Sequence, residues 1–404
     1  MRLSVIHRFV KCLDAKATLS SDRSNTSNTL MDEPLVYCVE SDPRILSNAC
    51  FLVGCFLVLR CQFSPEKAAQ VFDHLNLTPF RDATFTTPAV HGLSLRDCLA
   101  GFAKAVENKW FDFETFNLPE YEFWDQPEHG DIHRISDKFF AFKGPLQDEN
   151  SEHFVEGEIS FPPSFYATVF NRYKVTAVVR LNDTDTYDAS AFEDAGIRHY
   201  DLAFDDCTCP APALVDKFLK ICSEEPRIAI HCRAGLGRTG TLIAVWLMRN
   251  ANFSANQAIG WLRICRPGSV IGPQMAYLES IETSPTGPRP GNSVAPTMTA
   301  PFSAPGQSAR LAEQVTKSMC RRARLLNGLL QHHPAPPPKP CAAASDAPKA
   351  LAAPGTLDAA AGSKFTLDLI PPPVGVRAHV SALGSDRDRS LARGRTLRRR
   401  SQAL

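Results

Sequence analysis

The sequence predicts an α/β fold in which a central sheet is flanked by helices. Between residues 139 and 282, short apolar segments typical of buried strands alternate with helical patterns. The chain has 404 residues and is 44% hydrophobic, which is enough apolar material for two compact domains. Of its 31 prolines, 16 fall within residues 283–404, so this last segment is expected to be a disordered tail.

In the first part of the chain, apolar residues recur at helical spacing. We expect helices over residues 45–60, 65–75 and 94–108, and a linking helix over 117–124. The apolar stretch 49–59 is too short to span a bilayer, so it predicts a buried helix and no membrane partner.

The second part of the chain alternates between strand and helix periodicity. We expect strands over 139–142, 175–181, 197–202 and 227–231, and helices over 163–173, 211–222 and 239–250. Such alternation indicates a parallel sheet with helices on its faces. Ser254 and Gln257 have the spacing of a capping box that opens a further helix, and Pro273 is suited to the first position of the last helix, residues 274–281.

The segment 231–240 connects one of these strands to a helix. Gly235 and Gly237 allow a backbone in which successive N–H groups point at one anion. The positive end of the helix dipole adds to this attraction, and the Arg238 guanidinium can donate to two oxygens of one phosphate. The candidate phosphate-binding loop consists of Arg233, Ala234, Gly235, Leu236, Gly237 and Arg238.

Cys232 precedes this loop and is the candidate nucleophile. A helix N-terminus and a nearby cation favour the thiolate, which is the reactive form of cysteine. A lone cysteine after an apolar strand is usually a small buried side chain, but the full pattern favours the catalytic interpretation. Thr239 could donate a hydrogen bond to the sulfur or could simply cap the helix. His231 could orient the loop or be an ordinary core histidine.

A thiolate that attacks a phosphate ester also needs an acid to protonate the departing oxygen. The segment 201–210 follows a strand and precedes a helix, so it lies at the same edge of the sheet as the cysteine loop. It holds two adjacent candidates, Asp205 and Asp206. From chemistry alone, either carboxyl group could reach the departing oxygen. The alternative is that each is an ordinary solvated aspartate of a loop.

The segments 231–240 and 264–274 resemble the Cdc14 group of dual-specificity protein phosphatases, within the cysteine-based protein tyrosine phosphatases. The similarity covers about residues 36–282. Further matching segments are Pro79–Ala83, Phe111–Phe116, Glu120–Glu122, Val175–Asn182, Asp194–Gly196 and His199–Leu202.

The resemblance implies two phosphatase-like domains in tandem, each with a central sheet flanked by helices. Residues 36–138 would form an incomplete, non-catalytic domain with its linking helix, and residues 139–282 the catalytic domain. Residues 1–35 show no match to the family pattern, so we expect them to be disordered. Residues 283–404 form the tail.

The resemblance also implies hydrolysis of phosphoserine, phosphothreonine and phosphotyrosine through a phosphocysteine, in cell-cycle or mitotic control, with no metal or organic cofactor. Asp206, four residues before Pro210, would be the acid, and Gln274 a candidate for orienting the hydrolytic water. Substrates would be phosphoproteins with Ser-Pro or Thr-Pro sites followed by a basic residue. Glu122 is the candidate groove residue that would bind this basic residue, or else a solvated surface glutamate.

The sequence departs from the family pattern in the acid loop and after Gln274. Cys207 and Cys209 stand where the family has smaller or hydroxyl residues, and Met275 stands where a second glutamine is common. A low-pKa thiolate can be oxidised, so a redox link between Cys232 and a neighbour such as Cys207 is conceivable.

Three other functions compete with this interpretation. A sulfurtransferase also uses a cysteine in an anion loop, but it needs neither the acid-loop aspartate nor the Arg-Thr-Gly ending. A catalytically weak phosphopeptide-binding scaffold is suggested by the incomplete first domain. An inositol-lipid phosphatase would carry an extra loop lysine where this chain has Leu236.

The remaining composition bears on partners and location. Residues 311–330 could form a basic amphipathic helix on a protein partner, or stay disordered. The basic cluster 393–400 suggests the nucleus or nucleolus besides the cytoplasm, with centrosome or spindle pole as further sites, and predicts only nonspecific nucleic-acid affinity. The 13 cysteines lack a zinc-type pair of pairs and indicate a reducing compartment.

Overall fold

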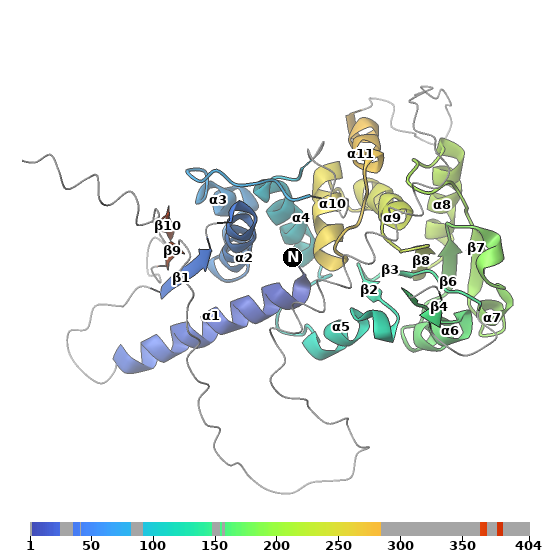
Figure 1. The fold of residues 1–404 in the computed structure, drawn as a ribbon, viewed down its shortest axis with the longest axis horizontal. Coiled ribbons are helices and arrows are strands. Elements are labelled where there is room, and N and C mark those ends of the chain that lie inside the picture. Colours follow the sequence, from blue (N-terminus) through green and yellow to red (C-terminus); the bar gives the residue numbers. More distant parts are fainter. Residues whose placement is uncertain are drawn as a thin grey trace, which may run out of the picture.

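The computed structural model describes residues 2–24, 35–40, 42–81, 92–147, 154–155, 158–283, 364–369 and 378–382. The first part of the chain is mainly helical, and the second part is built on a sheet (Figure 1). The predicted partner segment 311–330 and the basic cluster 393–400 lie outside the described residues.

Five helices form most of the first part. They are α1 (Leu3–Ser24), α2 (Pro43–Cys61), α3 (Pro65–Gln70), α4 (Leu95–Glu107) and α5 (Leu118–Trp124). The four helices expected here are confirmed, although α3 ends earlier than expected. Polar side chains start them: Asp42 accepts a hydrogen bond from the Arg44 backbone N–H, and Ser94 and Asp97 form a capping box.

The expectation that residues 1–35 are disordered is wrong for residues 3–24, which form helix α1. Leu3, Ile6, Val10 and Leu13 recur at helical spacing, and all four are buried. Their side chains join the same hydrophobic core as helix α2, so burial of this apolar stripe stabilises the helix.

Helix α2 is the one helix in the described part of the chain that is long and apolar enough to cross a membrane. Its most apolar window has a mean hydropathy of 1.6, and 56% of that window is buried within the protein. This burial agrees with the expected core helix.

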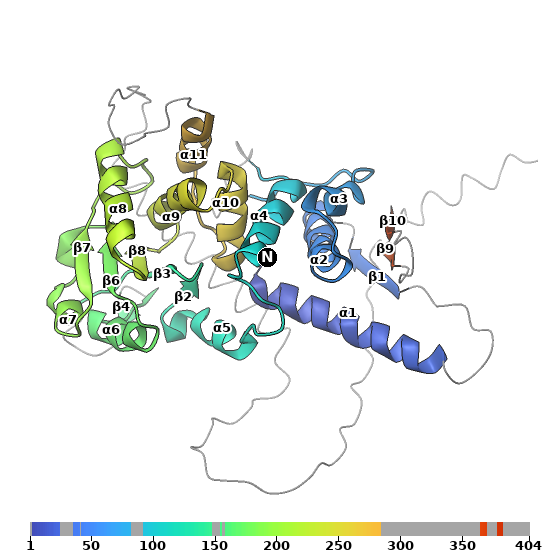
Figure 2. The ribbon, with the colours of Figure 1, turned by 180° about the vertical axis from the view of Figure 1, so that it is seen from behind.

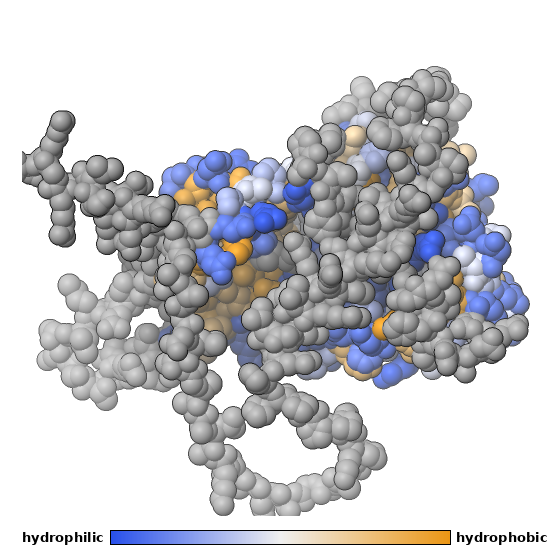
Figure 3. Space-filling view, viewed as in Figure 1, coloured by the Kyte–Doolittle hydropathy of each residue, from blue (hydrophilic) through white to orange (hydrophobic). Residues whose placement is uncertain are grey.

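The main sheet has five strands in the order β2-β3-β8-β6-β7. They are β2 (Ile132–Arg134), β3 (Phe139–Lys143), β8 (Ile228–Cys232), β6 (Ala177–Arg180) and β7 (Arg198–Asp201). Strands β3, β8, β6 and β7 are parallel, which confirms the expected sheet, and the additional edge strand β2 runs antiparallel to β3. Strand β8 is therefore central. Hydrophilic residues cover the side of the molecule at the other edge strand, β7 (Figure 3).

Helices cover both faces of this sheet (Figure 2). They are α6 (Pro163–Arg172), α7 (Ser190–Glu193), α8 (Pro212–Glu224), α9 (Gly237–Asn250), α10 (Ala255–Cys265) and α11 (Pro273–Thr283). Alternate strand residues face opposite sides: Val178 and Ala229 pack with α6 and α7, whereas Val179 and Ile230 belong to the core that includes α8, α9 and α10.

Short elements complete the described structure. They are the single-turn 3-10 helices Pro127–His129 and Thr184–Thr186, the small hairpin of β4 (Phe154–Val155) and β5 (Glu158–Ile159), and β1 (Leu35–Glu40), β9 (Lys364–Leu369) and β10 (Ala378–Ala382). Strands β1, β9 and β10 form an antiparallel sheet in the order β1-β9-β10. Strands β9 and β10 lie within residues 283–404, the tail for which we expect disorder. Residues 364–369 alternate between polar and apolar types, and β1 offers an edge with which they can pair.

The two parts of the chain meet through helices α4 and α10, which lie side by side in both views (Figures 1 and 2). Glycines allow the close approach. A Cβ on Gly101 would lie 2.3 Å from the backbone oxygen of Gln257, and one on Gly260 would lie 3.1 Å from the Cα of Cys98. The hydrophobic core continues from α1, α2 and α4 into α9 and α10, so the helical part is packed onto the sheet part.

Candidate active site

The candidate site lies at the carboxyl end of the central strand β8. Cys232 is the last residue of this strand, and α9 begins at Gly237, two residues earlier than expected. Leu236 occupies the N-cap position and no side chain caps the helix, so the interpretation of Thr239 as a plain helix cap is wrong. The loop therefore approaches a helix N-terminus whose backbone N–H groups have no side-chain acceptor.

The cysteine loop needs glycine at Gly235 for two reasons. Its φ angle is +67°, a conformation that residues with a Cβ rarely adopt. A Cβ there would also lie 2.0 Å from the backbone oxygen of Phe142 on β3. At Gly237 the space is limited by Gln274, whose Oε1 would lie 3.0 Å from an added Cβ. The two glycines of the sequence motif thus correspond to places where the backbone turns or packs closely.

Arg266 holds the cysteine loop by hydrogen bonds to its backbone, a role that the sequence did not predict. Its side chain is buried, its Nε donates to the backbone oxygen of Gly235 (2.7 Å), and its Nη2 donates to that of Ala234 (2.8 Å). Two successive loop carbonyls are thereby satisfied by one rigid guanidinium. The only signal in the sequence is an arginine at the end of an otherwise apolar helical pattern.

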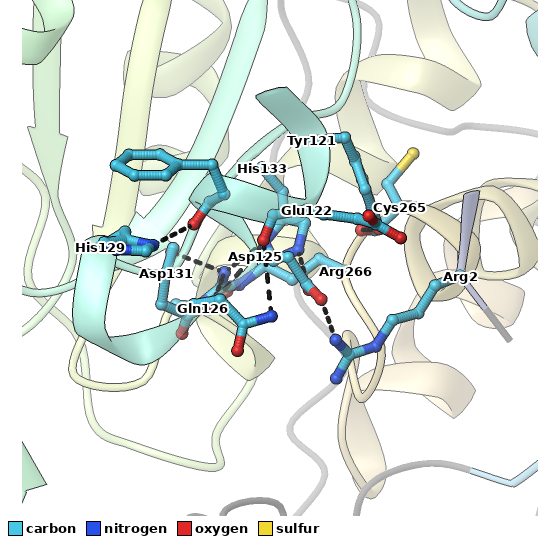
Figure 4. A network of polar contacts seen from close by, with 12 residues as sticks. Arg2, Tyr121, Glu122, Asp125, Gln126, His129, Asp131, His133, Cys265 and Arg266 are labelled. Atoms are coloured by element: carbon cyan, nitrogen blue, oxygen red, sulfur yellow. Dashed lines mark hydrogen bonds and ion pairs between the residues drawn. The ribbon is translucent and has the colours of Figure 1, made fainter. Parts of the chain in front are cut away.

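Arg266 is also the centre of a buried polar network (Figure 4). It forms a bidentate ion pair with Asp131 (both N···O distances 2.7 Å) and donates to His133 Nδ1 (2.8 Å). Since Nδ1 accepts, the proton of the His133 ring lies on Nε2, which donates to Asp125 Oδ1 (2.7 Å). Asp125 in turn pairs with Arg2, so contacts run from near the start of α1 to the cysteine loop.

Asp125 is almost fully buried in this network. Burial alone would raise its pKa, but the hydrogen bond from His133 and the charges of Arg2 and Arg266 outweigh it, so the pKa is lowered. The carboxylate therefore stays ionised as a fixed link between helix α5 and the sheet.

Arg238 is held in place and still has a free donor. Its side chain is 5% exposed, and its Nη1 donates to the backbone oxygens of Leu181 (3.1 Å) and Phe204 (2.8 Å). Its Nε lies 3.2 Å from Asp206 Oδ1 but without the alignment of a hydrogen bond, so this buried atom has no hydrogen-bond partner among the described residues. Such a donor suits an anion at the cysteine loop.

Thr239 is a second buried polar side chain without a partner. The residue is completely buried, and its Oγ1 makes no hydrogen bond within the described part of the chain. Cys232 is also buried, with 3% of its surface exposed. The surroundings thus fit the prediction that the Thr239 hydroxyl donates to the sulfur, which stays a prediction.

His231 orients the cysteine loop through both ring nitrogens. It is fully buried, and burial lowers its pKa to about 3, so the ring is neutral near pH 7. Its Nδ1 lies 3.0 Å from the backbone oxygen of Cys232 and therefore carries the proton. Its Nε2 then accepts from the Tyr187 hydroxyl (2.7 Å), which itself accepts from His199 Nε2 (2.9 Å). The contact with the Cys232 carbonyl fits the orienting interpretation of His231, and its complete burial with both nitrogens bonded also fits a core histidine.

The acid loop places one of its two aspartates at the cysteine loop. Asp206 contacts Arg238, as described above, and its side chain is 34% exposed. Asp205 is exposed, and its backbone oxygen accepts from the backbone N–H (3.3 Å) and hydroxyl (2.7 Å) of Thr208. The geometry therefore favours Asp206 as the acid, and the role itself stays a prediction.

Gln274 lies at the start of α11, as expected, and is completely buried. Its Oε1 accepts from the Ile271 backbone N–H (3.0 Å), and its Nε2 donates to the backbone oxygen of Thr208 (3.0 Å). Because it also packs against Gly237, Gln274 connects the acid loop to the cysteine loop. This position is compatible with orienting a water molecule, and that role stays a prediction.

Comparisons with known proteins agree with this geometry. Residues 1–105 match the family model of the N-terminal half of dual specificity protein phosphatases, and residues 166–252 match that of a DSP-PTPase phosphatase of polymorphic toxin systems. The human dual specificity protein phosphatase CDC14A is 39% identical over 289 residues, and human CDC14C is 41% identical over 262 residues. This chain is a homologue of the Cdc14 dual-specificity phosphatases.

The extent of these matches is partial. The CDC14A match covers 70% of this chain and 46% of the human protein, and the yeast (Saccharomyces cerevisiae) tyrosine-protein phosphatase CDC14 is 34% identical over 61% of this chain and 46% of its own length. The Cdc14 homologue thus spans about half the length of these relatives. A solved structure of the phosphatase Tk-PTP in its active form matches 37% of the chain, at 22% identity and a TM-score of 0.29.

Two family models on separate parts of the chain agree with the tandem arrangement of phosphatase-like halves. The first model begins at residue 1 and includes helix α1. The expectation that residues 1–35 match no part of the family is therefore wrong as well.

Glu122, the candidate groove residue of this Cdc14 homologue, lies on α5 and is paired with α1. Its two carboxylate oxygens accept from Nε (2.8 Å) and Nη2 (2.6 Å) of Arg8. The side chains of Glu122 and Arg8 are 35% and 62% exposed, so this is a surface ion pair. Glu122 is therefore paired with Arg8 and lies outside the cysteine loop. Its contact with substrate stays a prediction.

Proposed function

We propose that this chain is a dual-specificity protein phosphatase that removes phosphate from serine, threonine and tyrosine side chains of proteins. One observation carries the proposal. Cys232 is buried at the end of strand β8, facing a helix N-terminus, and the adjoining Arg238 and Thr239 each keep a buried polar atom without a hydrogen-bond partner among the described residues. A nucleophile, a cation and a hydroxyl donor around one anion site are the groups that cleavage of a phosphate ester requires.

In the first step, the Cys232 thiolate attacks phosphorus in line with the departing oxygen. Backbone N–H groups of the loop and the free donor of Arg238 stabilise the phosphoryl oxygens while charge moves onto them. Asp206 protonates the departing oxygen, which becomes the hydroxyl group of serine, threonine or tyrosine. The P–O bond breaks and an S–P bond forms, which gives a phosphocysteine.

In the second step, water attacks the phosphocysteine. Asp206 is now ionised and accepts a proton from this water, while Gln274 orients it. The S–P bond breaks, Cys232 leaves as a thiolate, and the Thr239 hydroxyl stabilises the sulfur charge by a hydrogen bond. Inorganic phosphate is released and the site returns to its starting state.

The proposal is tested with the full chain and two cysteine variants. Cys232→Ser should abolish phosphate release from both a phosphoserine-proline peptide and p-nitrophenyl phosphate, because a serine hydroxyl is a far weaker nucleophile than a thiolate. The matched control is Cys209→Ser, which changes an exposed thiol of the acid loop. Retained turnover in Cys232→Ser would overturn the assignment.

The same assay separates the alternatives. A wild-type chain that binds the phosphopeptide but releases no phosphate would be a scaffold. A chain that transfers sulfur from thiosulfate to cyanide faster than it hydrolyses phosphopeptide would be a sulfurtransferase. The contact between Asp206 and Arg238 argues for phosphate chemistry, because sulfur transfer needs no acid at this point.

For specificity, we propose a preference for phosphoserine or phosphothreonine followed by proline and a basic residue. Glu122 is the candidate to bind the basic residue of the substrate, which would have to compete with Arg8 for the Glu122 carboxylate. A peptide panel that varies these positions tests the preference. Glu122→Gln should reduce the advantage of basic peptides over neutral ones in kcat/KM, and Arg8→Gln should increase it. An unchanged ratio in both variants would contradict the assignment of Glu122.

A role in cell-cycle control and a location in the nucleus, nucleolus and cytoplasm belong to the same proposal. The names of the relatives support the first, and the basic cluster 393–400 supports the second. Imaging of the full chain beside a variant with the five arginines of this cluster changed to glutamine tests the location. Unchanged nuclear signal in the variant would contradict import through the cluster.

A further inference from the structure

Phosphate binding at the cysteine loop depends on the orientation of its peptide units. Four successive carbonyl groups at the start of the loop each accept from a donor of the protein; they belong to Cys232, Arg233, Ala234 and Gly235. The C=O and N–H groups of a planar trans peptide unit point in opposite directions, so the N–H groups of residues 233–236 are directed away from these donors. The contacts that hold the carbonyls therefore decide where the N–H groups point.

Arg266 holds two of these four carbonyls, those of Ala234 and Gly235, through Nη2 and Nε. A guanidinium has five N–H donors in one rigid plane, so acceptors at its other end fix how it faces the loop. At that end, Nη1 and Nη2 each donate to one carboxylate oxygen of Asp131 (2.7 Å), and Nη1 also lies 2.9 Å from the Asp131 backbone oxygen. Most of the acceptors that orient Arg266 toward the loop thus belong to one residue.

Asp131 itself has an unusual backbone conformation. Its φ angle is +51°, and it follows Gly130 with a φ angle of +106°. A residue with a Cβ keeps such a conformation only where its surroundings impose it. The buried Tyr166 hydroxyl donates to the Gly130 backbone oxygen (3.0 Å), and the Lys143 backbone N–H donates to that of Asp131 (3.3 Å). This anchored turn places the Asp131 carboxylate against Arg266 (Figure 4).

We propose that Asp131 is a positioning residue for phosphate binding. By holding Arg266, it orients the peptide units whose N–H groups belong to Gly235 and Leu236. The inference rests on the proposed function, because it assigns the support of the same phosphate-binding loop. Asp131 acts through Arg266 and does not itself contact the phosphate.

The negative charge of Asp131 is needed as well as its two oxygens. Arg266 is only 2% exposed, and a buried guanidinium without a carboxylate is an unpaired charge. In Asp131→Asn, an NH2 group replaces one oxygen and faces an N–H donor of Arg266. The guanidinium must then turn or shift, which disturbs its hydrogen bonds to the two loop carbonyls. The size of the side chain at position 131 stays the same.

A purely structural role is the alternative, because the same ion pair joins Asp131, next to strand β2, to the end of helix α10. Loss of such a role would make the fold less stable, but it would leave the anion affinity of the folded molecules unchanged. Anion binding and stability, measured on the same proteins, therefore separate the two roles.

The experiment measures binding of tungstate, a tetrahedral dianion like phosphate, to the full chain by isothermal titration calorimetry, and stability by urea unfolding. Asp131→Asn is the test variant. Asp137→Asn is the matched control for the lost charge, since Asp137 forms an exposed ion pair with Arg134. Val169→Ala is the control for lost stability, because Val169 is buried in a core cluster that contains no described residue of the cysteine loop.

Tyr166→Phe is a milder test variant that does not alter the ion pair. It removes only the hydroxyl that holds the turn at Gly130, so it remains informative if Asp131→Asn does not fold.

We expect Asp131→Asn to weaken tungstate binding at least about tenfold, the effect of losing one or two charge-assisted hydrogen bonds, and Tyr166→Phe to weaken it about threefold. Asp137→Asn and Val169→Ala should bind tungstate as the wild-type chain does, although Val169→Ala unfolds at lower urea concentration. The inference is overturned if Asp131→Asn, or Tyr166→Phe where Asp131→Asn does not fold, binds as tightly as the wild-type chain. It is also overturned if Val169→Ala loses as much affinity as Asp131→Asn.

Tungstate binding does not depend on turnover, so this inference and the proposed function fail in different ways. A wild-type chain that binds tungstate, loses this binding in Asp131→Asn and releases no phosphate from any phosphopeptide would support the inference and overturn the proposed function. A chain that hydrolyses phosphopeptides while Asp131→Asn binds tungstate normally would do the reverse.

Discussion

The two loops of the candidate site are held in very different ways. The cysteine loop is mostly buried, and two side chains engage three of its backbone oxygens: His231 contacts that of Cys232, and Arg266 donates to those of Ala234 and Gly235. The acid loop is half exposed, and its described contacts with the rest of the site come from the backbone oxygen of Phe204, which accepts from Arg238, and from Asp206, Thr208 and the thiol of Cys209.

This difference separates two requirements of the proposed chemistry. Phosphate binding needs several donors in fixed directions, which only a rigid, buried loop can provide. Proton transfer needs one carboxyl group within reach, which a few contacts can arrange. Substitutions are therefore expected to be tolerated in the acid loop, where this chain has Cys207 and Cys209, and not in the cysteine loop.

The largest effect is expected from Gly235→Ala. The added Cβ would lie 2.0 Å from the Phe142 backbone oxygen, so the loop must move and its donors lose their alignment. We expect kcat/KM for p-nitrophenyl phosphate to fall at least about a thousandfold. Gly196→Ala is the matched control, because Gly196 also has a positive φ angle (+77°) but nothing within 4 Å of an added Cβ. Equal activity losses in the two variants would show that the cysteine loop is not held as the structure indicates.

Asp206→Asn tests the acid loop itself. We expect kcat on a phosphoserine peptide to fall about a hundredfold, because a serine alkoxide cannot leave without a proton. The loss on p-nitrophenyl phosphate should be smaller, since p-nitrophenolate leaves readily without one. Asp205→Asn, the control next to it in sequence, should stay within about threefold of the wild-type chain, because its residue is exposed. If Asp205→Asn is the slower of the two, the assignment of the acid is reversed.

The histidines beneath the cysteine loop predict how stability depends on pH. Burial lowers the pKa of His231 to about 3 and that of His199 to about 4, whereas both would titrate near 6.5 in the unfolded chain. The unfolded state thus takes up protons first, so the free energy of unfolding should fall as the pH is lowered from about 6.5 to 4.5. The slope is roughly 1.4 kcal/mol per pH unit for each histidine.

Urea unfolding at several pH values measures this slope in the wild-type chain and in His199→Asn. The variant should lose about half of the slope in that pH window, whatever its stability at pH 7. An unchanged slope would mean that His199 does not remain neutral in the folded protein.

The smallest effect is expected at the pair of Arg8 and Glu122. Both side chains are partly exposed to solvent, so a double-mutant cycle with alanine should give a coupling energy of about 0.2–1 kcal/mol in urea unfolding. The same cycle on Asp125 and His133, which are buried in the network of Arg266, should give a clearly larger value. Comparable coupling energies would contradict the distinction between buried and exposed contacts on α5.

Much of the fold and site could be predicted from the sequence because the signals are local. The helix and strand periodicities between residues 139 and 282 predicted the main sheet, and the spacing from Cys232 to Arg238 predicted the phosphate-binding loop. The capping box at Ser254 and the helical start at Pro273 are confirmed for the same reason, since a cap involves neighbouring residues.

Other features depend on contacts between residues far apart in the sequence. Arg266 reaches Asp131 across 135 positions, and no local pattern indicates which partner an arginine will find. Helix α1 has an apolar stripe, but only the core provided by α2 and the neighbouring helices makes it a stable helix. Strand β9 likewise pairs with β1, more than 300 positions away.

The sequence alone predicts the chemistry proposed for Cys232, because the loop's glycines, arginine and helix start are adjacent in the chain. Only the tertiary structure shows which aspartate approaches Arg238 and that Glu122 is paired with Arg8. The physical reason is distance along the chain: each of these contacts joins loops or helices that come together only when the sheet and the helical part are packed into one core.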